Sequence, residues 1–518
     1  MNSRLNLLCL TLCCGLFASV GYAEETPVKP THAVSLTQAH KGNLEIDTYL
    51  LDSFGRLPQR RRTFYLAGRQ ILSDSPTATP SDPKIIAAAK EAEVPLISGP
   101  MLGDVSESGI TVWFRPIHSE ALTVQVTTEG KKNKDFPADV TRPGAVTRVR
   151  LTDLPPNTQH TYQIVNGAGS VLGEGSFRTA PKPNTGETIR IAFGSCFHKI
   201  GVHNPNLMRL VAERGNYAML LLGDLAVDDR ESKVNMHYAD YLLRDVSKPW
   251  RTFSASIPVY TSWDDHDYLN NDKSGLQKGQ IGDKERNALR QVWKDNWNNP
   301  PTRVEDRGIY FNTVIGDVEI IMLDTRSCRT WKKRGKRGAY LGDEQMDWLF
   351  RTLKASSARF IILTSGTMWS DYMSKAKDSW GSWDILGREK IFDFIEKNKI
   401  GGVLLLSGDR HGARGFKIKR PSGFTLHEFE AATLGGVPGP GAFAPDRSSQ
   451  MFGYKGGLKA FGEFTFDMSK PDPEATFRLI NEEGKELETH TFLHSLLVPR
   501  KNRANNPMQA TPNGAPDG

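Results

Sequence analysis

The sequence predicts an α/β domain that is preceded by a small β-sandwich, and three observations support this prediction. Six short apolar runs between residues 188 and 407 each end in a cluster of polar residues. Helical patterns, with apolar residues three and four positions apart, lie between these runs. Upstream, residues 98–181 carry short alternating strand patterns that are separated by glycine, proline and asparagine turns.

The composition is that of a folded, water-soluble chain. Its 518 residues are 38% hydrophobic and 24% charged, which excludes a peptide hormone, a single small binding module and a fibrous repeat. The formal net charge of +7 is spread over the whole length and does not predict sequence-independent nucleic-acid binding. This mild charge permits a small anionic substrate without requiring one. We also expect a monomer with no stable nucleic-acid partner.

The first 23 residues have the pattern of a secretory signal peptide. Arg4 precedes an apolar run, and Gly21 and Ala23 place small residues at positions −3 and −1 of a cut before Glu24. An uncleaved membrane anchor is the alternative, although the apolar run is short for a membrane span. We expect a secreted or periplasmic protein with no transmembrane segment in the mature chain. Cleavage would leave Cys196 and Cys328 as the remaining cysteines.

The rest of the chain divides into four parts. Residues 24–97 form an N-terminal extension, in which the arginine run at 60–62 is interpreted as a solvated face. Residues 98–181 resemble a fibronectin type III or immunoglobulin-like β-sandwich. Residues 188–495 form the α/β domain, and a disordered tail is expected over residues 496–518.

Four of the polar clusters that follow apolar runs contain side chains suited to metal binding. They are Cys196 with His198, Asp224, the run Asp264–Asp267, and Asp409 with His411. Ligands in α/β sheets gather at the carboxyl ends of the strands, so these clusters are expected to meet. The alternative is that the aspartates are ordinary helix caps and solvated loop residues, which would require four such coincidences at successive strand ends.

A thiolate, imidazoles and several carboxylates at one sheet edge suit a pair of cations. Two ions about 3.5–4 Å apart lower the pKa of a shared water and hold the attacking and leaving oxygens of an in-line displacement. This chemistry hydrolyses phosphoesters without a side-chain nucleophile. The sequence has no G-x-S-x-G, G-x-x-x-x-G-K-[ST], H-E-x-x-H or C-x-x-C motif, so other common chemistries have less support.

Seven segments, taken in order, resemble the alkaline phosphatase D-like (PhoD-like) family of calcineurin-like metallophosphatases. They are GSCF, LLGDLAVDD, YTSWDDHD, LDTRS, YLGDEQMDWL, a segment with Trp380, Trp383 and Arg388, and LLLSGDRHG. The resemblance spans roughly residues 98–480 and includes the β-sandwich, and WDDHD with SGDRH is its most specific part. It implies a four-layer αββα metallophosphatase sandwich, secretion, and hydrolysis of phosphate monoesters or diesters.

The resemblance also implies roles for individual residues. Cys196 would bind the first metal, Asp224 would bridge both metals, and Asp265 would bind the second. His266 would act at the leaving-group oxygen, as a general acid or by stabilising charge in the transition state. The last motif supplies two further ligands, Asp409 for the second metal and His411 for the first.

Asp264 would not bind a metal itself; its carboxylate would orient the neighbouring metal ligands.

One position departs from the family pattern. The family usually has an iron-binding tyrosine three residues after the bridging aspartate, where this chain has Val227. We propose His198 as the replacement ligand, since it lies two residues after Cys196, with a polar loop histidine as the alternative. Asp228 and Asp229 are weaker candidates. The family's usual pair is ferric iron with calcium; here we expect Fe or Zn at the first site and Ca, Mg or Mn at the second.

Basic and aromatic residues near the expected site have several interpretations. Arg326 is expected to clamp the phosphate, and Arg329 is an alternative clamp or a surface ion pair. The basic loop 331–337 is either a solvated face or an attractor of anionic substrate. A tryptophan-rich segment, residues 369–383, is expected in the core, with a lid as the alternative.

We expect a secreted two-metal hydrolase that cleaves phosphate monoesters or diesters by in-line attack of a metal-bound hydroxide. Two alternatives stay open. One is a catalytically weakened cell-surface binding protein, and the other is a periplasmic nuclease or phospholipid phosphodiesterase. A disulfide between Cys196 and Cys328 is also open, although it would consume the proposed ligand.

Overall fold

A computed structural model of the chain describes residues 26–500, apart from residues 32 and 371 and the segments 226–232, 276–282, 302–307 and 373–377. The predicted signal peptide and residues 501–518 of the predicted tail lie outside these described residues. Within them, no helix combines the length and the apolar character that crossing a membrane requires.

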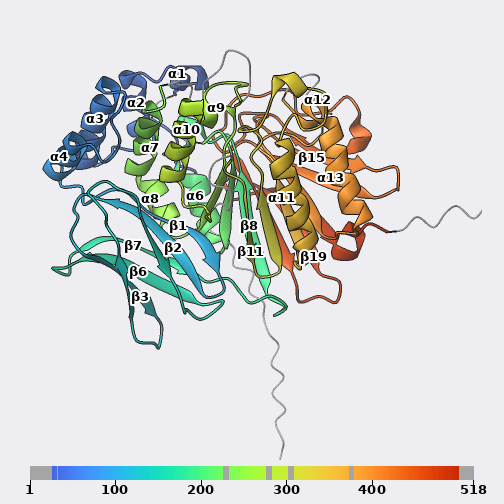
Figure 1. The fold of residues 1–518 in the computed structure, drawn as a ribbon, viewed down its shortest axis with the longest axis horizontal. Helices are drawn as coiled ribbons and strands as arrows, with labels where there is room; N and C mark the ends of the chain where they lie inside the picture. Colours follow the sequence, from blue (N-terminus) through green and yellow to red (C-terminus); the bar gives the residue numbers. More distant parts are fainter. Residues whose placement is uncertain are drawn as a thin grey trace, which may run out of the picture.

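Two mixed β-sheets form the centre of the larger part of the molecule (Figure 1). In the six-stranded sheet, β8 and β10 run parallel to β9, whereas β18, β19 and β20 add antiparallel strands on the other side of β8. The strand order is β10 (Val259–Ser262), β9 (Ala218–Leu222), β8 (Thr188–Gly194), β18 (Ala460–Asp467), β19 (Glu474–Asn481) and β20 (Glu486–Leu493).

The seven-stranded sheet has four parallel strands, β12, β13, β14 and β16, with antiparallel neighbours at both ends. Its order is β11 (Phe311–Ile315), β12 (Val318–Met322), β13 (Phe360–Thr364), β14 (Val403–Ser407), β16 (Thr425–Ala431), β15 (Ala413–Lys419) and β17 (Gln450–Tyr454). All six apolar runs of the sequence therefore form strands, and every residue of β9, β12, β13 and β14 is buried, as parallel strands covered on both faces require.

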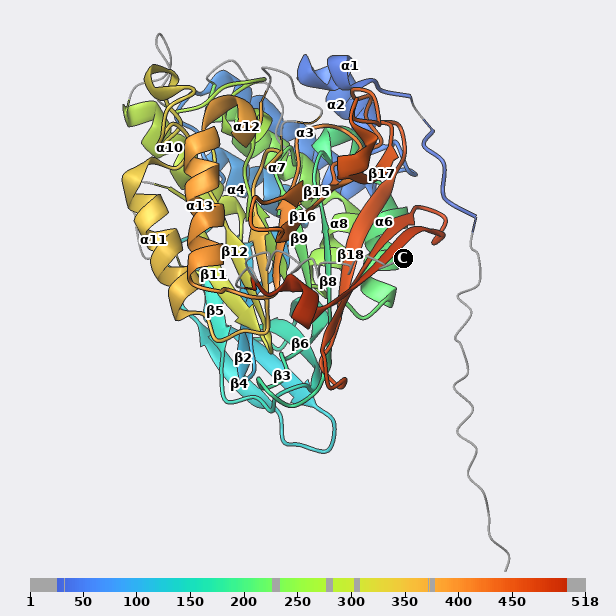
Figure 2. The same cartoon turned by 90° about the vertical axis from the view of Figure 1, so that its right-hand side faces the viewer.

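The two sheets pack face to face and helices cover their outer faces. Phe193 of β8 and Ile362 of β13 belong to the buried cluster between the sheets. Leu221 points to the opposite face of its sheet, into a cluster with the helices α6–α8, and Leu363 points into a cluster with α11 and α13. The order of layers is helix, sheet, sheet, helix, which is the αββα arrangement that the family resemblance implies (Figure 2).

The helices after residue 195 include four that the three- and four-residue apolar spacing predicts, namely α6, α10, α11 and α13. The bounds are α5 (His198–Gly201), α6 (Pro205–Glu213), α7 (Met236–Val246), α8 (Lys248–Ser254), α9 (Asp265–Tyr268), α10 (Asp283–Asn296), α11 (Gly342–Ala355), α12 (Trp380–Trp383) and α13 (Ile385–Lys397). The described residues also include the 3₁₀ helices η1 (Trp331–Lys333), η2 (Arg447–Ser449) and η3 (His494–Leu497). Leu497 is buried, although the tail was expected to begin at residue 496.

The N-terminal extension is helical and packs on the α/β domain beside α7 (Figure 1). Its helices are α1 (Leu36–His40), α2 (Leu44–Leu51), α3 (Gln59–Asp74) and α4 (Pro83–Glu91). The arginine run at the start of α3 is only partly a solvated face. Arg60 is exposed, but Arg61 is buried and Arg62 is paired with Asp52. The helix turns successive residues to different sides, so a run of three arginines cannot all face water.

Two smaller antiparallel sheets follow the extension. One has the order β1 (Leu96–Ser106), β2 (Gly109–Pro116) and β5 (Thr147–Leu151). The other has the order β4 (Lys134–Ala138), β3 (Leu122–Thr128), β6 (Gln159–Asn166) and β7 (Val171–Arg178). Val112 of β2 and Val124 of β3 share one buried cluster, and alternate residues of β3 and β5 are buried as the sequence pattern predicts.

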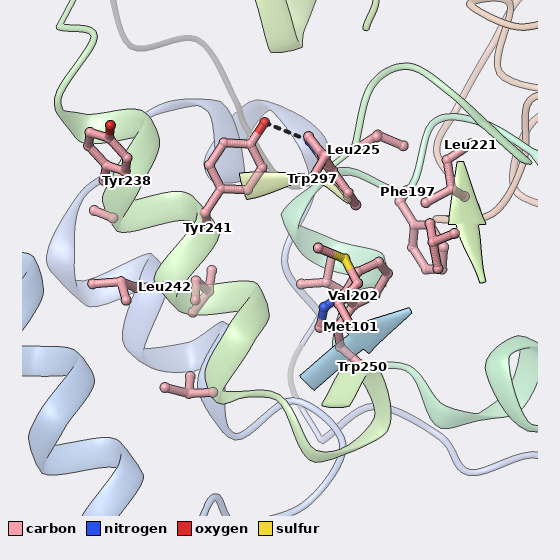
Figure 3. Close-up of a cluster of buried hydrophobic side chains, with 14 of the residues drawn as sticks. Met101, Phe197, Val202, Leu221, Leu225, Tyr238, Tyr241, Leu242, Trp250 and Trp297 are labelled. Atoms are coloured by element: carbon pink, nitrogen blue, oxygen red, sulfur yellow. Dashed lines mark hydrogen bonds between the residues drawn. The ribbon is translucent and has the colours of Figure 1, made fainter. Parts of the chain in front are cut away.

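A second buried cluster joins β1 and the helices to the domain that carries the polar clusters. Figure 3 shows Met101 of β1 close to Trp250 of α8 and Val202, with Phe197 and Leu225 on the neighbouring loops. The hydroxyl of Tyr241 on α7 accepts a hydrogen bond of 3.1 Å from the Trp297 indole, so the polar atoms of these large side chains are satisfied. Phe197 and Leu225 thus anchor the loops after β8 and β9 in this buried cluster.

The tryptophans of the segment that was expected in the core are buried in the outer helical layer. Trp369 and Trp380 are fully buried and their rings are stacked, with centroids 5.0 Å apart. Trp331, in the basic loop, is exposed and packs against Trp383 with Arg334 over both rings. The four lysines and arginines around Arg334 are exposed.

Candidate active site

The four polar clusters meet at one end of the two central sheets. Cys196 follows β8, Asp224 follows β9, Asp265 follows β10, and Asp409 and His411 follow β14. Parallel strands in each sheet end at the same edge, and the face-to-face packing of the sheets brings both edges together. The juxtaposition expected from the sequence is thus present.

Five residues of these loops adopt left-handed backbone conformations that are uncommon for non-glycine residues. The φ angles are 57° at Cys196, 46° at His198, 54° at Asp224, 79° at Asp409 and 46° at His411. Such conformations cost free energy and concentrate at functional sites, where the surrounding structure holds them. The ligand atoms of all five side chains belong to the converging groups described next.

The first group of converging ligand atoms comes from Cys196, His198, Asp224 and His411, whose donor atoms all lie within 4.8 Å of one another. The Cys196 thiol donates a hydrogen bond to Asp224 Oδ2 at 3.4 Å, and His198 Nε2 lies 3.9 Å from the same oxygen. One sulfur, two imidazole nitrogens and one carboxylate form a donor set that suits iron or zinc.

The second group consists of Asp224, Asp264, Asp265 and Asp409, again with one ligand atom each within 4.8 Å of the others. His266 converges with Asp224 and Asp265 in a further group. Because Asp224 belongs to every one of these groups, its two oxygens can serve two neighbouring cations. The second group is richer in oxygen and suits a harder cation than the first.

Hydrogen bonds behind the site orient several of these side chains. His411 Nδ1 lies 2.6 Å from the carbonyl oxygen of Pro438, so Nδ1 donates and Nε2 faces the first group. Asp265 accepts hydrogen bonds from the backbone amides of His266 and Asp272, at 2.9 and 2.7 Å. These contacts leave the remaining lone pairs of both residues for other partners.

Asp267, the last residue of the WDDHD motif, acts as a clamp between two loops. Its carboxylate accepts backbone hydrogen bonds from Asp224, Leu225 and Asp264, at 2.6, 2.9 and 3.0 Å. The motif therefore supplies both site residues and the group that fixes the β9 loop against the β10 loop. Sequence reasoning assigned no separate role to Asp267, although its place inside the motif was a visible signal.

Burial and mutual repulsion dominate the electrostatics. Burial, followed by the charge of Asp265, raises the pKa of Asp224, and burial, followed by the charge of Asp264, raises the pKa of Asp409. Burial and Asp224 raise the pKa of the Cys196 thiol. Asp265 is the exception, since Arg326 and His266 outweigh its burial and lower its pKa.

These residues fit a cation site. Asp224 Oδ1 and Asp409 Oδ2 are buried and have no hydrogen-bond partner within the described part of the chain. Burying a carboxylate oxygen without a partner costs free energy, and neighbouring carboxylates add repulsion. Cations bound between the carboxylates, the thiol and the imidazoles would satisfy both oxygens and balance the excess of negative charge.

The structure places Arg326 behind the carboxylates with its side chain fully buried. Arg326 Nε donates to Asp264 Oδ1 at 2.7 Å, and Nη1 lies 2.8 Å from Asp378 Oδ2. Arg329 is also fully buried and donates to the other oxygen of Asp378 at 2.6 Å. These contacts favour a role in orienting Asp264 over a phosphate clamp, and they exclude a surface ion pair for Arg329.

Some sequence expectations lie outside the described residues or were incomplete. Val227, Asp228 and Asp229 belong to the segment that the structure does not describe, so the departure from the family tyrosine has no structural account. Cys196 and Cys328 are not joined in a disulfide. His40, from the N-terminal extension, reaches the site, and no pattern in the sequence signalled it.

Comparisons with known proteins relate the chain to phosphatases. A family model described as PhoD-like phosphatase matches residues 228–448. Alkaline phosphatase D of Bacillus subtilis (strain 168) is 23% identical over 395 residues, which cover 64% of this chain and 67% of the relative.

Two solved structures share the fold. The structure of PhoD has a TM-score of 0.62 at 19% identity, and the match covers 79% of this chain and 92% of that chain. A purple acid phosphatase, PPD1 from yellow lupin (Lupinus luteus) seeds, has a TM-score of 0.56 at 13% identity, with 76% and 74% covered. These structural matches support the fold of the two central sheets and their helices.

Proposed function

Because this chain belongs to the PhoD-like phosphatase family and is a phosphohydrolase, we propose that it is an exported two-metal enzyme that cleaves phosphate monoesters or diesters. The observation that carries the proposal is the position of Asp224. It belongs both to a group with a thiol and two imidazoles and to a group of four carboxylates. A carboxylate shared by two such groups is the arrangement that a two-cation site needs.

The residues divide the work as follows. Cys196, His198 and His411 would hold one cation, Asp265 and Asp409 would hold the other, and Asp224 would bridge them. The cations would lower the pKa of a water molecule and withdraw charge from the phosphoryl oxygens. The first would be Fe or Zn and the second Ca, Mg or Mn, according to the donor sets.

His266 would place its imidazole at the oxygen of the leaving group. Its donor atom converges with Asp224 and Asp265, so a phosphoester held between the two groups would lie within its reach. An imidazole there can donate a proton to the departing alkoxide or stabilise its charge. Arg326 would hold Asp264 and would thereby fix the second group from behind.

Substrate is expected to enter near residues 409–411. Asp409, Arg410 and His411 are only partly buried, whereas Cys196, Asp224 and Asp265 are buried. We also propose that the two antiparallel sheets of residues 96–178 form a fibronectin- or immunoglobulin-like β-sandwich, supported by their shared buried cluster.

The experiment is metal analysis combined with hydrolysis of a chromogenic phosphate monoester and the matching diester. The wild type should bind two metals and hydrolyse at least one substrate. Asp224→Asn should lose metal and nearly all turnover, whereas the exposed control Asp139→Asn should retain both. Unchanged activity in Asp224→Asn would exclude the bridging role. Two bound metals with no activity on any phosphoester would favour a binding protein instead.

A further inference from the structure

A histidine from the N-terminal extension contacts the histidines of the candidate active site. His40 is the last residue of α1, and its ring centroid lies 4.6 Å from that of His266 and 5.6 Å from that of His198. The rings of His198 and His266 are 5.4 Å apart. Three imidazoles from three separate elements therefore pack together at the end of the sheets, where Figure 1 shows α1 near α9.

The geometry separates His40 from the converging ligands. His198, His266 and His411 each belong to a group of ligand atoms within 4.8 Å of one another, whereas in the described part of the chain His40 belongs to none. Its ring contacts both site histidines, and the shorter of these two contacts is with His266, at an interplanar angle of 37°. The position is that of a residue that packs against a site histidine.

The extension is held in this position by buried charges. Lys199 of α5, the residue after His198, is fully buried and lies 2.7 Å from Asp47 of α2 and 3.1 Å from Asp240 of α7. Asp47 also accepts a hydrogen bond of 2.6 Å from Arg69 of α3. Charges buried in this way require their partners, because removing one leaves an uncompensated charge.

Further contacts fix both ends of the segment before His40. The side chain of Asn206, on α6, donates to the carbonyl of Val28 and accepts from its amide, both at 3.0 Å. At the start of α1, Ser35 and Gln38 form a capping box. The extension therefore contacts α5 through Asp47 and α6 through Val28, and these contacts keep α1 beside the site.

We propose that His40 is a positioning residue that orients the His266 imidazole, and that the N-terminal extension is therefore part of the active site. This inference rests on the proposed role of His266 at the leaving group. A side chain packed on one face of the His266 ring restricts the rotation of that ring about its side-chain bonds. Catalytic groups act efficiently when their orientation is fixed before substrate binds.

The kinetic test uses a series of aryl phosphates whose leaving groups differ in basicity, with His40→Ala as the test variant. We expect kcat for the most basic leaving group to fall by about 10- to 100-fold, with a smaller loss for 4-nitrophenyl phosphate and little change in KM. A basic leaving group depends most on the aligned imidazole. His40→Phe, which keeps a flat ring at this position, should retain most of the activity.

Two control variants separate this role from a general effect. Thr37→Ala alters an exposed residue of the same helix, and His118→Ala removes an exposed histidine elsewhere, and neither should change kcat. The double variant His40→Ala/His266→Ala should be no slower than His266→Ala, because both changes act through one group. An additive loss in the double variant, or a His40→Phe variant as slow as His40→Ala, would overturn the proposal.

A second measurement does not depend on activity. Crystal structures of the metal-free wild type and of metal-free His40→Ala should show a rotated or disordered His266 ring only in the variant. An unchanged His266 ring would overturn the proposal. If the wild type hydrolysed no phosphoester, the proposed function would fail, and this comparison would still decide whether His40 orients His266.

Discussion

Arg326 Nε lies 2.7 Å from Asp264 Oδ1, and both side chains are fully buried. The same guanidinium contacts Asp378, which in turn binds Arg329. Two arginines and two aspartates thus form a chain of buried ion pairs behind the proposed metal ligands. The guanidinium of Arg326 is held between two carboxylates, so it is suited to fixing the position of Asp264.

Arg326→Ala should therefore destabilise the protein more than it weakens substrate binding. Removal of one partner from a buried charge network costs about 3–5 kcal/mol in unfolding free energy. The measurement is chemical unfolding together with KM for a phosphate monoester. A phosphate clamp would give the opposite pattern, with a large increase in KM and little change in stability. Arg326→Lys keeps the charge but not the planar guanidinium, so its stability should lie between that of the wild type and that of Arg326→Ala.

Asp224→Asn should change stability in opposite directions in the metal-free and metal-loaded proteins. In the metal-free protein the substitution removes a buried charge with neighbouring carboxylates, and we expect a gain of about 1–3 kcal/mol at pH 8. In the presence of metal, the wild type gains binding free energy that the variant lacks. The check is thermal unfolding with chelator and with added metal. A variant that is less stable than the wild type under chelator would contradict the repulsion argument.

Asp47→Ala should lower the metal affinity of the first site although Asp47 lies outside it. The substitution leaves Lys199 and Arg69 with one partner fewer, and Lys199 adjoins His198 on α5. We expect a loss of about 3–5 kcal/mol in stability and release of the metal bound by Cys196 and His198. Metal analysis after gel filtration measures this release. Loss of stability with two metals retained would show that α5 keeps its position without the ion pair between Asp47 and Lys199.

Acid should destabilise the fold through His203, which follows α5 and is buried. Burial lowers the pKa of His203 to about 4 from the ordinary value of 6.5. The unfolded chain then binds a proton that the folded chain does not, so stability falls as the pH drops from 6.5 toward about 4. The loss approaches about 3 kcal/mol for this residue.

The measurement for His203 compares urea unfolding of the wild type and His203→Leu at pH 7.5 and at pH 4.5. The difference between the two proteins should change in favour of the variant at the lower pH. His427, whose pKa burial likewise lowers to about 4, is retained in both proteins and contributes equally to each. An identical difference at the two pH values would exclude the effect.

Periodicity and motif position predicted much of this molecule. The six apolar runs form strands of the two central sheets. They were predictable because a run of consecutive apolar residues is typical of a parallel strand that is buried on both faces. The convergence of Cys196, Asp224 and Asp409 followed from strand ends alone. The strand order could not be predicted, because it depends on packing between segments that are far apart in the sequence. The strand order in turn decides which loops are in contact.

The residues that sequence reasoning missed share one property. Asp378, Lys199 and His40 contact partners far away in the chain, and none of the three is itself part of a motif. Arg326 shows how a role inferred from position alone can compete with buried contacts. A basic residue beside a strand end was expected to face the substrate, but two buried carboxylates compete for it and hold it inside.

The pairing of β8 with β18 sets the order in which this molecule can mature. Phe193 of β8, three residues before Cys196, pairs with Gly462 of β18. The strand β18 comes about 270 residues later in the sequence than β8. Until that partner is synthesised, β8 has an exposed edge and the loop that carries the thiol is unsupported on one side. Metal should therefore enter only after the whole chain has folded, and a chain truncated before β18 should neither hold metal nor resist proteolysis.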